Sequence, residues 1–253
     1  MDDLEVIVVD DGSTDATADR LRQFGERIIT IHQTNRGLSA ARNMGIRRAT
    51  GEFLAFLDAD DRFLACKLSI QRAYLNNQPE CGAVFSDGFL VSPDGQVLNL
   101  ISAESPQGLY AVQSPAELRR ILFRGHPFPP HSGLVRKACA IAVGLFDETM
   151  RAREDLDFWL RLSVVFPICY LPGVMVEYTV RAESLSRSSE IMYINSCILY
   201  DRILNFPEFH LLTRREKAQN LRAWAMEVGV LHYGPWAKHG SRPQFYAREA
   251  LRH

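Results

Sequence analysis

The first half of this sequence alternates short, largely apolar runs with segments of helical periodicity. Residues 4–9 read LEVIVV and residues 53–57 read FLAFL, while residues 38–49 have the pattern of a helix that ends near Gly51. Strands without polar residues are buried on both faces, and strand–helix alternation places helices over both faces of a sheet. The sequence therefore predicts an α/β fold with a Rossmann-like, mostly parallel sheet flanked by helices.

The alternation ends after the first half of the chain. Residues 168–180 are strand-like but contain a break at Pro172-Gly173, and from about Ser189 the sequence turns helical. We therefore expect one domain over residues 1–187 and a helical C-terminal extension over residues 188–253.

Composition and charge indicate an ordinary globular protein. Of the 253 residues, 47% are hydrophobic and 23% are charged, and the formal net charge is −1. A surface that binds nucleic acid is normally basic, so no nucleic-acid partner is expected.

Cysteine usage and hydropathy indicate a cytoplasmic protein. The five cysteines are odd in number and form no C-x-x-C pair, which predicts reduced thiols. The N-terminus has no apolar signal-peptide run, and no apolar stretch reaches the roughly 20 residues that cross a bilayer. Peripheral contact with the inner face of the membrane stays open, because Trp224, Tyr233 and Trp236 either pack internally or form an exposed cluster that docks there.

An acidic turn, Asp10-Asp11-Gly12-Ser13, follows the first apolar run. In a parallel sheet, ligands bind beyond the carboxyl ends of the strands, where carboxylates can accept hydrogen bonds from a base or a ribose. The same residue types also suit a turn with a helix cap. Both interpretations of Asp10, Asp11 and Ser13 stay open.

A second acidic turn, Asp58-Ala59-Asp60-Asp61, follows the FLAFL run. Three carboxylates in four residues repel one another unless a cation neutralises them. Oxygen ligands of this kind suit Mg²⁺ or Mn²⁺, which would bridge to a substrate diphosphate. A solvated acidic turn is the alternative.

Arg42 lies near the start of the helix predicted over residues 38–49, which the chain approaches through Gly37. A helix N-terminus favours an anion, and an arginine there can reach a phosphate. The alternative is a surface arginine paired with an acid.

Glu154 and Asp155 directly precede an amphipathic helix predicted over residues 156–165. The helix dipole favours the charged form of a carboxylate at this position, and a general base must be deprotonated. Both residues are therefore candidate catalytic bases, and helix capping is the competing interpretation.

Five strings, in this order, resemble family 2 glycosyltransferases with the GT-A fold. They are VVDDGSTDAT, NRGLSAARNMGI, GEFLAFLDADD, VGLFDE and EDLDFWLRL, and the resemblance covers roughly residues 4–187. It implies metal-dependent transfer of a sugar, with inversion, from a nucleoside-diphosphate sugar to a hydroxyl of an unknown sugar or lipid-linked acceptor. The resemblance further implies Mn²⁺ or Mg²⁺ as cofactor and a place in surface polysaccharide or glycolipid synthesis.

The resemblance also implies roles for single residues. Asp11 would contact the nucleoside, Arg42 would lie near the diphosphate or uridine, and Asp58 would lie near the ribose or diphosphate. Asp60 would ligate the metal beside Asp58, and Asp155 would deprotonate the acceptor hydroxyl.

Two departures from the family pattern matter. Where members often carry Tyr-Arg-x-His, this sequence has Tyr178-Thr179-Val180-Arg181, so Arg181 would replace a histidine at the phosphates. Members also usually have a strand and helix before the DDGS strand, whereas this sequence begins at that strand. We therefore expect a truncated or misassigned start and unpaired edges on the neighbouring strands.

Two other functions remain as alternatives. A non-catalytic, nucleotide-binding remnant of the same fold would follow from the missing strand. A nucleotidyltransferase is also an α/β protein with metal-binding carboxylates, although no glycine-rich phosphate loop is found here. Acceptor choice would lie in the proline-rich stretch Gly125–His131 and in the tail, where His126 and His131 contact substrate or have only structural roles.

Overall fold

The computed structural model describes residues 3–104, 114–124, 130–181 and 189–232. The strands are β1 (Ile7–Asp11), β2 (Ile29–Gln33), β3 (Phe53–Leu54), β4 (Arg62–Phe63), β5 (Ala83–Val91), β6 (Val97–Leu100), β7 (Leu134–Arg136) and β8 (Ile168–Thr179). The helices are α1 (Thr17–Arg22), α2 (Leu38–Arg48), α3 (Lys67–Asn77), α4 (Ile101–Glu104), α5 (Pro115–Leu122), α6 (Lys137–Ala142), α7 (Glu154–Val165), α8 (Ser189–Leu204), α9 (Pro207–His210) and α10 (Arg214–His232).

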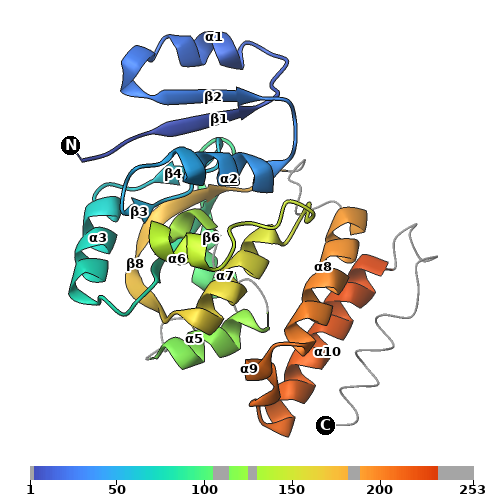
Figure 1. Cartoon of the computed structure of the whole chain (residues 1–253). Helices are drawn as coiled ribbons and strands as arrows, with labels where there is room; N and C mark the ends of the chain where they lie inside the picture. The colour runs from blue at the N-terminus through green and yellow to red at the C-terminus, as the bar shows by residue number, and fades with distance from the viewer. Residues whose placement is uncertain (1–2, 105–113, 125–129, 182–188, 233–253) are drawn as a thin grey trace.

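The strands form two sheets rather than one. β1 and β2 pair in parallel, and α2 lies between them and the larger sheet, whose order is β3-β7-β5-β8-β4 with β6 also on β5 (Figure 1). Only β5 and β8 pair in parallel within the larger sheet, so that sheet is mixed. The predicted α/β fold, with helices flanking the sheet, is confirmed, but the prediction of a mostly parallel sheet is wrong for the larger sheet, where four of the five strand pairings that the structure describes are antiparallel. Among the described strands β1 pairs only with β2, and β3 only with β7.

The sequence predicted a break in this strand at Pro172-Gly173, and that prediction is wrong. Strand β8 continues through these residues to Thr179. Its register with β5 shifts at this point, because Ser86 faces Leu171 and Asp87 faces Val174. The extra residues form a bulge, where a proline needs no ladder hydrogen bond, and Gly173 has a φ of +134° that side-chain-bearing residues rarely adopt. The bulge accommodates Pro172 and Gly173 within the strand, so that β8 continues to the candidate site.

The prediction of reduced thiols is wrong for two cysteines. Cys81 and Cys169 form a disulfide across 88 residues of sequence. Cys169 lies opposite Val84 in the parallel β5–β8 pairing, and Cys81 lies just before β5. The strand pairing brings the two cysteines together, and their spacing in the sequence gave no sign of it.

One contiguous hydrophobic core joins the sheet to the C-terminal helices. It includes Phe85 and Trp159 together with Tyr200 of α8 and Trp224 of α10. The Tyr200 and Trp224 rings stack at 4.6 Å, and Trp224 Nε1 donates to the Phe123 carbonyl at 3.0 Å. Trp224 is therefore a packing residue, while the division at residues 187/188 stays a prediction.

Two further features bear on the predicted membrane contact. Tyr233 and Trp236 lie outside the described residues. In the part of the chain that the structure describes, no helix combines the length and apolarity needed to cross a membrane.

A buried lysine lies behind the second acidic turn. Lys67, at the start of α3, is 1% exposed, and its ammonium donates to Gln71 Oε1 at 2.7 Å and to the Gly133 carbonyl at 3.2 Å. It also lies 4.3 Å from the centre of the Phe63 ring. Burial lowers the pKa of Lys67 to about 7, because removal from water disfavours the charged form.

The buried ammonium makes stability depend on pH. In the unfolded chain a lysine stays protonated to about pH 10.4, so between pH 7 and 10 the unfolded state binds more protons than the folded state. The free energy of unfolding then rises with pH in this window. We expect Lys67→Met to gain stability relative to wild type below pH 7, and this gain to shrink at higher pH by up to about 1.4 kcal/mol per pH unit.

Urea unfolding at pH 6.5, 8 and 9.5 measures this difference. Lys217→Met removes a lysine that is only partly buried and donates to the His210 carbonyl, and it serves as the matched control. A difference in stability between Lys67→Met and wild type that stays the same at all three pH values would contradict the titration of Lys67.

Candidate active site

The carboxylate of Asp11, at the end of β1, is bound to the segment that leads into α2. It accepts hydrogen bonds from Gln33 Nε2 at 2.6 Å and from the backbone N–H groups of Arg36 and Gly37, each at 2.8 Å. The adjacent Gly12 has a φ of +83°, and a Cβ there would lie 2.8 Å from the Asn35 nitrogen. Asp11, predicted to contact a nucleoside, thus holds the turn before α2 in this structure.

Asp10 and Ser13 form a local turn at the same sheet edge. Asp10 Oδ1 accepts the Ser13 N–H at 2.9 Å, and Asp10 Oδ2 lies 3.0 Å from Nδ1 of His32 at the end of β2. Hydrogen bonds from Ser13, and then the one from His32, lower the pKa of Asp10. The His32 side chain is about half exposed beside this buried carboxylate. The turn interpretation of this motif therefore describes the contacts of both residues, but no side-chain hydrogen bond caps α1.

Arg42 connects two motifs that are far apart in the sequence. Its side chain is only 7% exposed, Nη1 donates to Glu154 Oε1 at 2.8 Å, and Nη2 donates to Asp58 Oδ1 at 3.0 Å. The guanidinium also lies 5.3 Å from the centre of the Phe146 ring. Burial alone would lower the pKa of Arg42, but the Asp58 and Glu154 carboxylates outweigh burial and raise it. The arginine predicted to meet a phosphate is therefore a buried bridge between two acids.

The three acids of the second turn point in different directions. Asp58 is partly exposed and faces Arg42. Asp60 is also partly exposed, and its Oδ2 lies 3.0 Å from Nε of Arg181. Asp61 is buried, and its Oδ1 accepts the Thr179 N–H at 2.8 Å at the end of β8. The strand that continues past its bulge thus anchors the acidic turn and places Arg181 beside Asp60.

A possible metal-binding group forms at the buried side of this turn. One oxygen each of Asp58 and Asp61 and one ring nitrogen of His131 all lie within 4.8 Å of one another. His131, in the short helical turn Pro130–Ser132, is 1% exposed, and its Nδ1 is 3.1 Å from Asp61 Oδ2. Burial raises the pKa of Asp61 to about 7, and the nearby carboxylates of Asp58 and Asp60 act in the same direction. Carboxylate oxygens suit Mn²⁺ or Mg²⁺, and Mn²⁺ accepts an imidazole nitrogen more readily than Mg²⁺ does, so of the two ions the donor set fits Mn²⁺ better.

The two candidate bases have unlike surroundings. Glu154 is buried against Arg42, and burial, assisted by the neighbouring Asp155, raises its pKa while Arg42 opposes the rise. Asp155 is partly exposed, and its Oδ1 accepts the Leu156 N–H at 2.7 Å in the first turn of α7. Glu154 therefore acts through Arg42, while Asp155 is the acid of the pair that solvent can reach.

Sequence reasoning missed two residues of this arrangement. Asp61 belongs to the acidic turn, but the sequence favoured its neighbours Asp58 and Asp60 as metal ligands. His131 was open between substrate contact and a structural role, and no spacing linked it to residues 58–61. The one available signal was a histidine at the end of a proline-rich stretch, and His126 of the same stretch lies outside the described residues.

Comparison with known sequences matches the N-terminal half of the chain to a family. Residues 1–124 match the model of Glycosyl transferase family 2. An uncharacterized glycosyltransferase of Rickettsia bellii (strain RML369-C) is 29% identical over 178 residues, which is 64% of this chain and 22% of that protein. The chain also spans only 31% and 25% of two similar Rickettsia proteins. The chain is therefore much shorter than these relatives.

Comparison with solved structures extends to nearly the whole chain. The crystal structure of S. aureus TarS 1–349 in complex with UDP-GlcNAc has a TM-score of 0.69 at 21% identity, covering 99% of this chain and 71% of that one. The mannosyltransferase PcManGT from Pyrobaculum calidifontis, in complex with GDP-Man and Mn²⁺, has a TM-score of 0.62 at 19% identity, with the same coverage of both chains. Residues 1–124 of the chain therefore match glycosyl transferase family 2 in sequence, and the chain has the GT-A fold over nearly its whole length.

Proposed function

We propose that this protein transfers a sugar from a nucleoside-diphosphate sugar to a hydroxyl acceptor, with inversion at the anomeric carbon. The observation that carries the proposal is the Arg42 guanidinium, which binds Asp58 at 3.0 Å and Glu154 at 2.8 Å. It links the acidic turn expected to hold the donor to the segment expected to supply the base, 96 residues later in the sequence. A cytoplasmic enzyme of surface polysaccharide or glycolipid synthesis, at or near the membrane, is the setting that the resemblance implies.

The donor class rests on both the site and the similar proteins. TarS was solved with UDP-GlcNAc and PcManGT with GDP-Man, so both folds accept nucleoside-diphosphate sugars. In this chain the end of β2 offers the half-exposed His32, held by the buried Asp10, to a base or ribose. Arg181, half exposed beside Asp60, is positioned to meet phosphate oxygens.

A divalent metal fits the acidic turn. Asp58 would hold it with Asp60, as the resemblance implies, or with Asp61 and His131, whose donor atoms lie close together. PcManGT was solved with Mn²⁺. When bound, such an ion neutralises the charge that grows on the departing nucleoside diphosphate.

In the proposed sugar transfer, Asp155 is the general base. Its carboxylate accepts the proton of the acceptor hydroxyl, and the acceptor oxygen forms a bond to the anomeric carbon as the bond to the diphosphate breaks. The nucleoside diphosphate leaves with the electron pair of that bond. Glu154 holds Arg42, and Arg42 holds Asp58, so these residues position the site without contacting the acceptor oxygen.

We expect UDP or GDP to bind wild-type protein with Mn²⁺ or Mg²⁺ and to lose at least about tenfold in affinity with EDTA, because charge on the diphosphate is then unbalanced. Calorimetric titration of Asp60→Ala and Asp61→Asn identifies the ligand set, since the variant that removes a ligand loses the effect of metal. Asp94→Asn, in the exposed turn after β5, is the matched control. Equal binding of the nucleotide to wild type with and without metal would contradict the proposal.

We expect Asp155→Asn to lower kcat by about 10²- to 10⁴-fold, because the base is lost, with little change in nucleotide affinity. Glu154→Gln should instead lower the free energy of unfolding by roughly 1–3 kcal/mol and weaken nucleotide binding, since Arg42 loses a charged partner. Released nucleoside diphosphate and an acceptor-linked sugar are measured together. Release of pyrophosphate would indicate nucleotidyl transfer, and metal-dependent binding without any turnover would indicate a binding remnant.

A further inference from the structure

The backbone just before the candidate base has a conformation that is unfavourable for its residue type. Arg153, the residue that precedes α7, has φ of 62° and ψ of 7°, in the left-handed region. A Cβ disfavours this region, and no side-chain hydrogen bond caps the helix at this position. Residues in such conformations persist where the surroundings hold them, and they gather at functional sites.

Helix α8, from the C-terminal part of the chain, supplies contacts that hold this segment. Asn195 Oδ1 accepts the backbone N–H of Arg151 at 3.1 Å, and Ser196 Oγ accepts from Arg153 Nε at 3.3 Å. Asn195 and Ser196 are both buried. Asn195 therefore binds the backbone of Arg151, and the adjacent Ser196 binds the side chain of Arg153.

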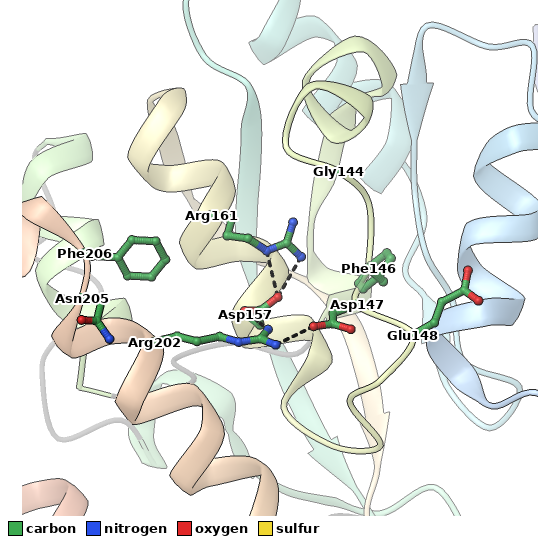
Figure 2. Close-up of a pocket in the computed structure, with 9 residues that line it drawn as sticks. All are labelled: Gly144, Phe146, Asp147, Glu148, Asp157, Arg161, Arg202, Asn205 and Phe206. Carbon is green, nitrogen blue, oxygen red and sulfur yellow. Dashed lines mark hydrogen bonds and ion pairs between the residues drawn. The ribbon is translucent and has the colours of Figure 1, made fainter.

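A second attachment lies two turns further along α8. Arg202 Nη1 donates to Asp157 Oδ1 at 2.9 Å, and Nη2 donates to Asp147 Oδ2 at 2.6 Å. Figure 2 shows that Arg202 and Arg161 approach the Asp157 carboxylate from α8 and from α7, beside a cavity of about 650 Å³. Since Asp157 is buried in the first turn of α7, α8 is bound to the chain both before and after Asp155.

We propose that α8 is a positioning element for the catalytic base. Asn195 and Ser196 hold residues 151–153, and with them the left-handed conformation of Arg153 that sets the start of α7. From there Glu154 reaches Arg42, and Asp155 is left at the solvent-accessible side. The inference rests on the proposed function of Asp155. Asn195 and Ser196 are positioning residues, because they act through Arg151 and Arg153.

A matched pair of asparagines tests the proposal. Asn195 and Asn205 each donate from Nδ2 to the carbonyl four residues earlier, at 2.8 Å, but Asn195 also accepts the Arg151 N–H. We expect Asn195→Ala to lower kcat about tenfold or more, with donor KM and nucleotide affinity within about twofold of wild type, because small displacements of a reacting group cost rate more than binding. Asn205→Ala should keep the wild-type kcat.

Two substitutions of Arg153 separate the effect of the left-handed backbone conformation from the effect of losing the side chain. Arg153→Ala removes the contact to Ser196 and leaves a Cβ in the left-handed region, whereas Arg153→Gly removes both the contact and the Cβ. We expect the glycine variant to keep at least about fivefold more kcat than the alanine variant. Equal losses of kcat in the two Arg153 variants, or equal kcat for Asn195→Ala and Asn205→Ala, would overturn the proposal.

Hydrogen exchange distinguishes failure of the proposed role of α8 from failure of the proposed function. The backbone amides of residues 154–157 should exchange about tenfold faster in Asn195→Ala than in Asn205→Ala, since the start of α7 opens more often. This readout does not need turnover. If wild type releases no nucleoside diphosphate from any donor, the proposed function fails, while the exchange result still decides whether α8 holds the start of α7.

Discussion

The arrangement of the site depends on one buried guanidinium. Arg42 brings Asp58 and Glu154 onto opposite sides of a single cation, and its own helix is fixed through Asp11 and Gly37. A buried charge without partners is costly, so the buried Arg42 requires Asp58 and Glu154, and the buried Glu154 requires Arg42. This mutual requirement keeps three distant parts of the chain, residues 11–42, 58–61 and 153–157, in one relative position.

The order of the elements and the places of the acids followed from the sequence. Apolar runs such as FLAFL favour strands of a covered sheet, although Leu57 of this run is 49% exposed, and acids that follow such strands lie at a sheet edge. The predicted strands and helices of the first half exist within a few residues, although β3 keeps only Phe53 and Leu54 of its run. The local sequence pattern is enough to predict these elements, because each strand or helix has its own periodicity of apolar residues.

The partners of the acids did not follow from the sequence. His131 reaches Asp61 through the pairing of β7 with β5, and Cys81 reaches Cys169 through the pairing of β5 with β8. Burial of Glu154 and exposure of Asp155 depend on which face of α7 meets Arg42, which adjacent acids in a sequence cannot reveal. The mixed larger sheet has the same origin, since strand direction is set by connections that carry no periodic signal.

The shared core has a consequence for how such chains diversify. A tail that met the rest of the protein only through a linker could be exchanged between relatives as a module. Here Tyr200 and Trp224 lie in the same core as Trp159, and Asn195 and Arg202 bind residues that flank Asp155. A chimera joined near residue 188 would therefore separate two halves of one interface. The unit of exchange is α8 together with residues 144–165, so the tail and the base segment are expected to change in concert.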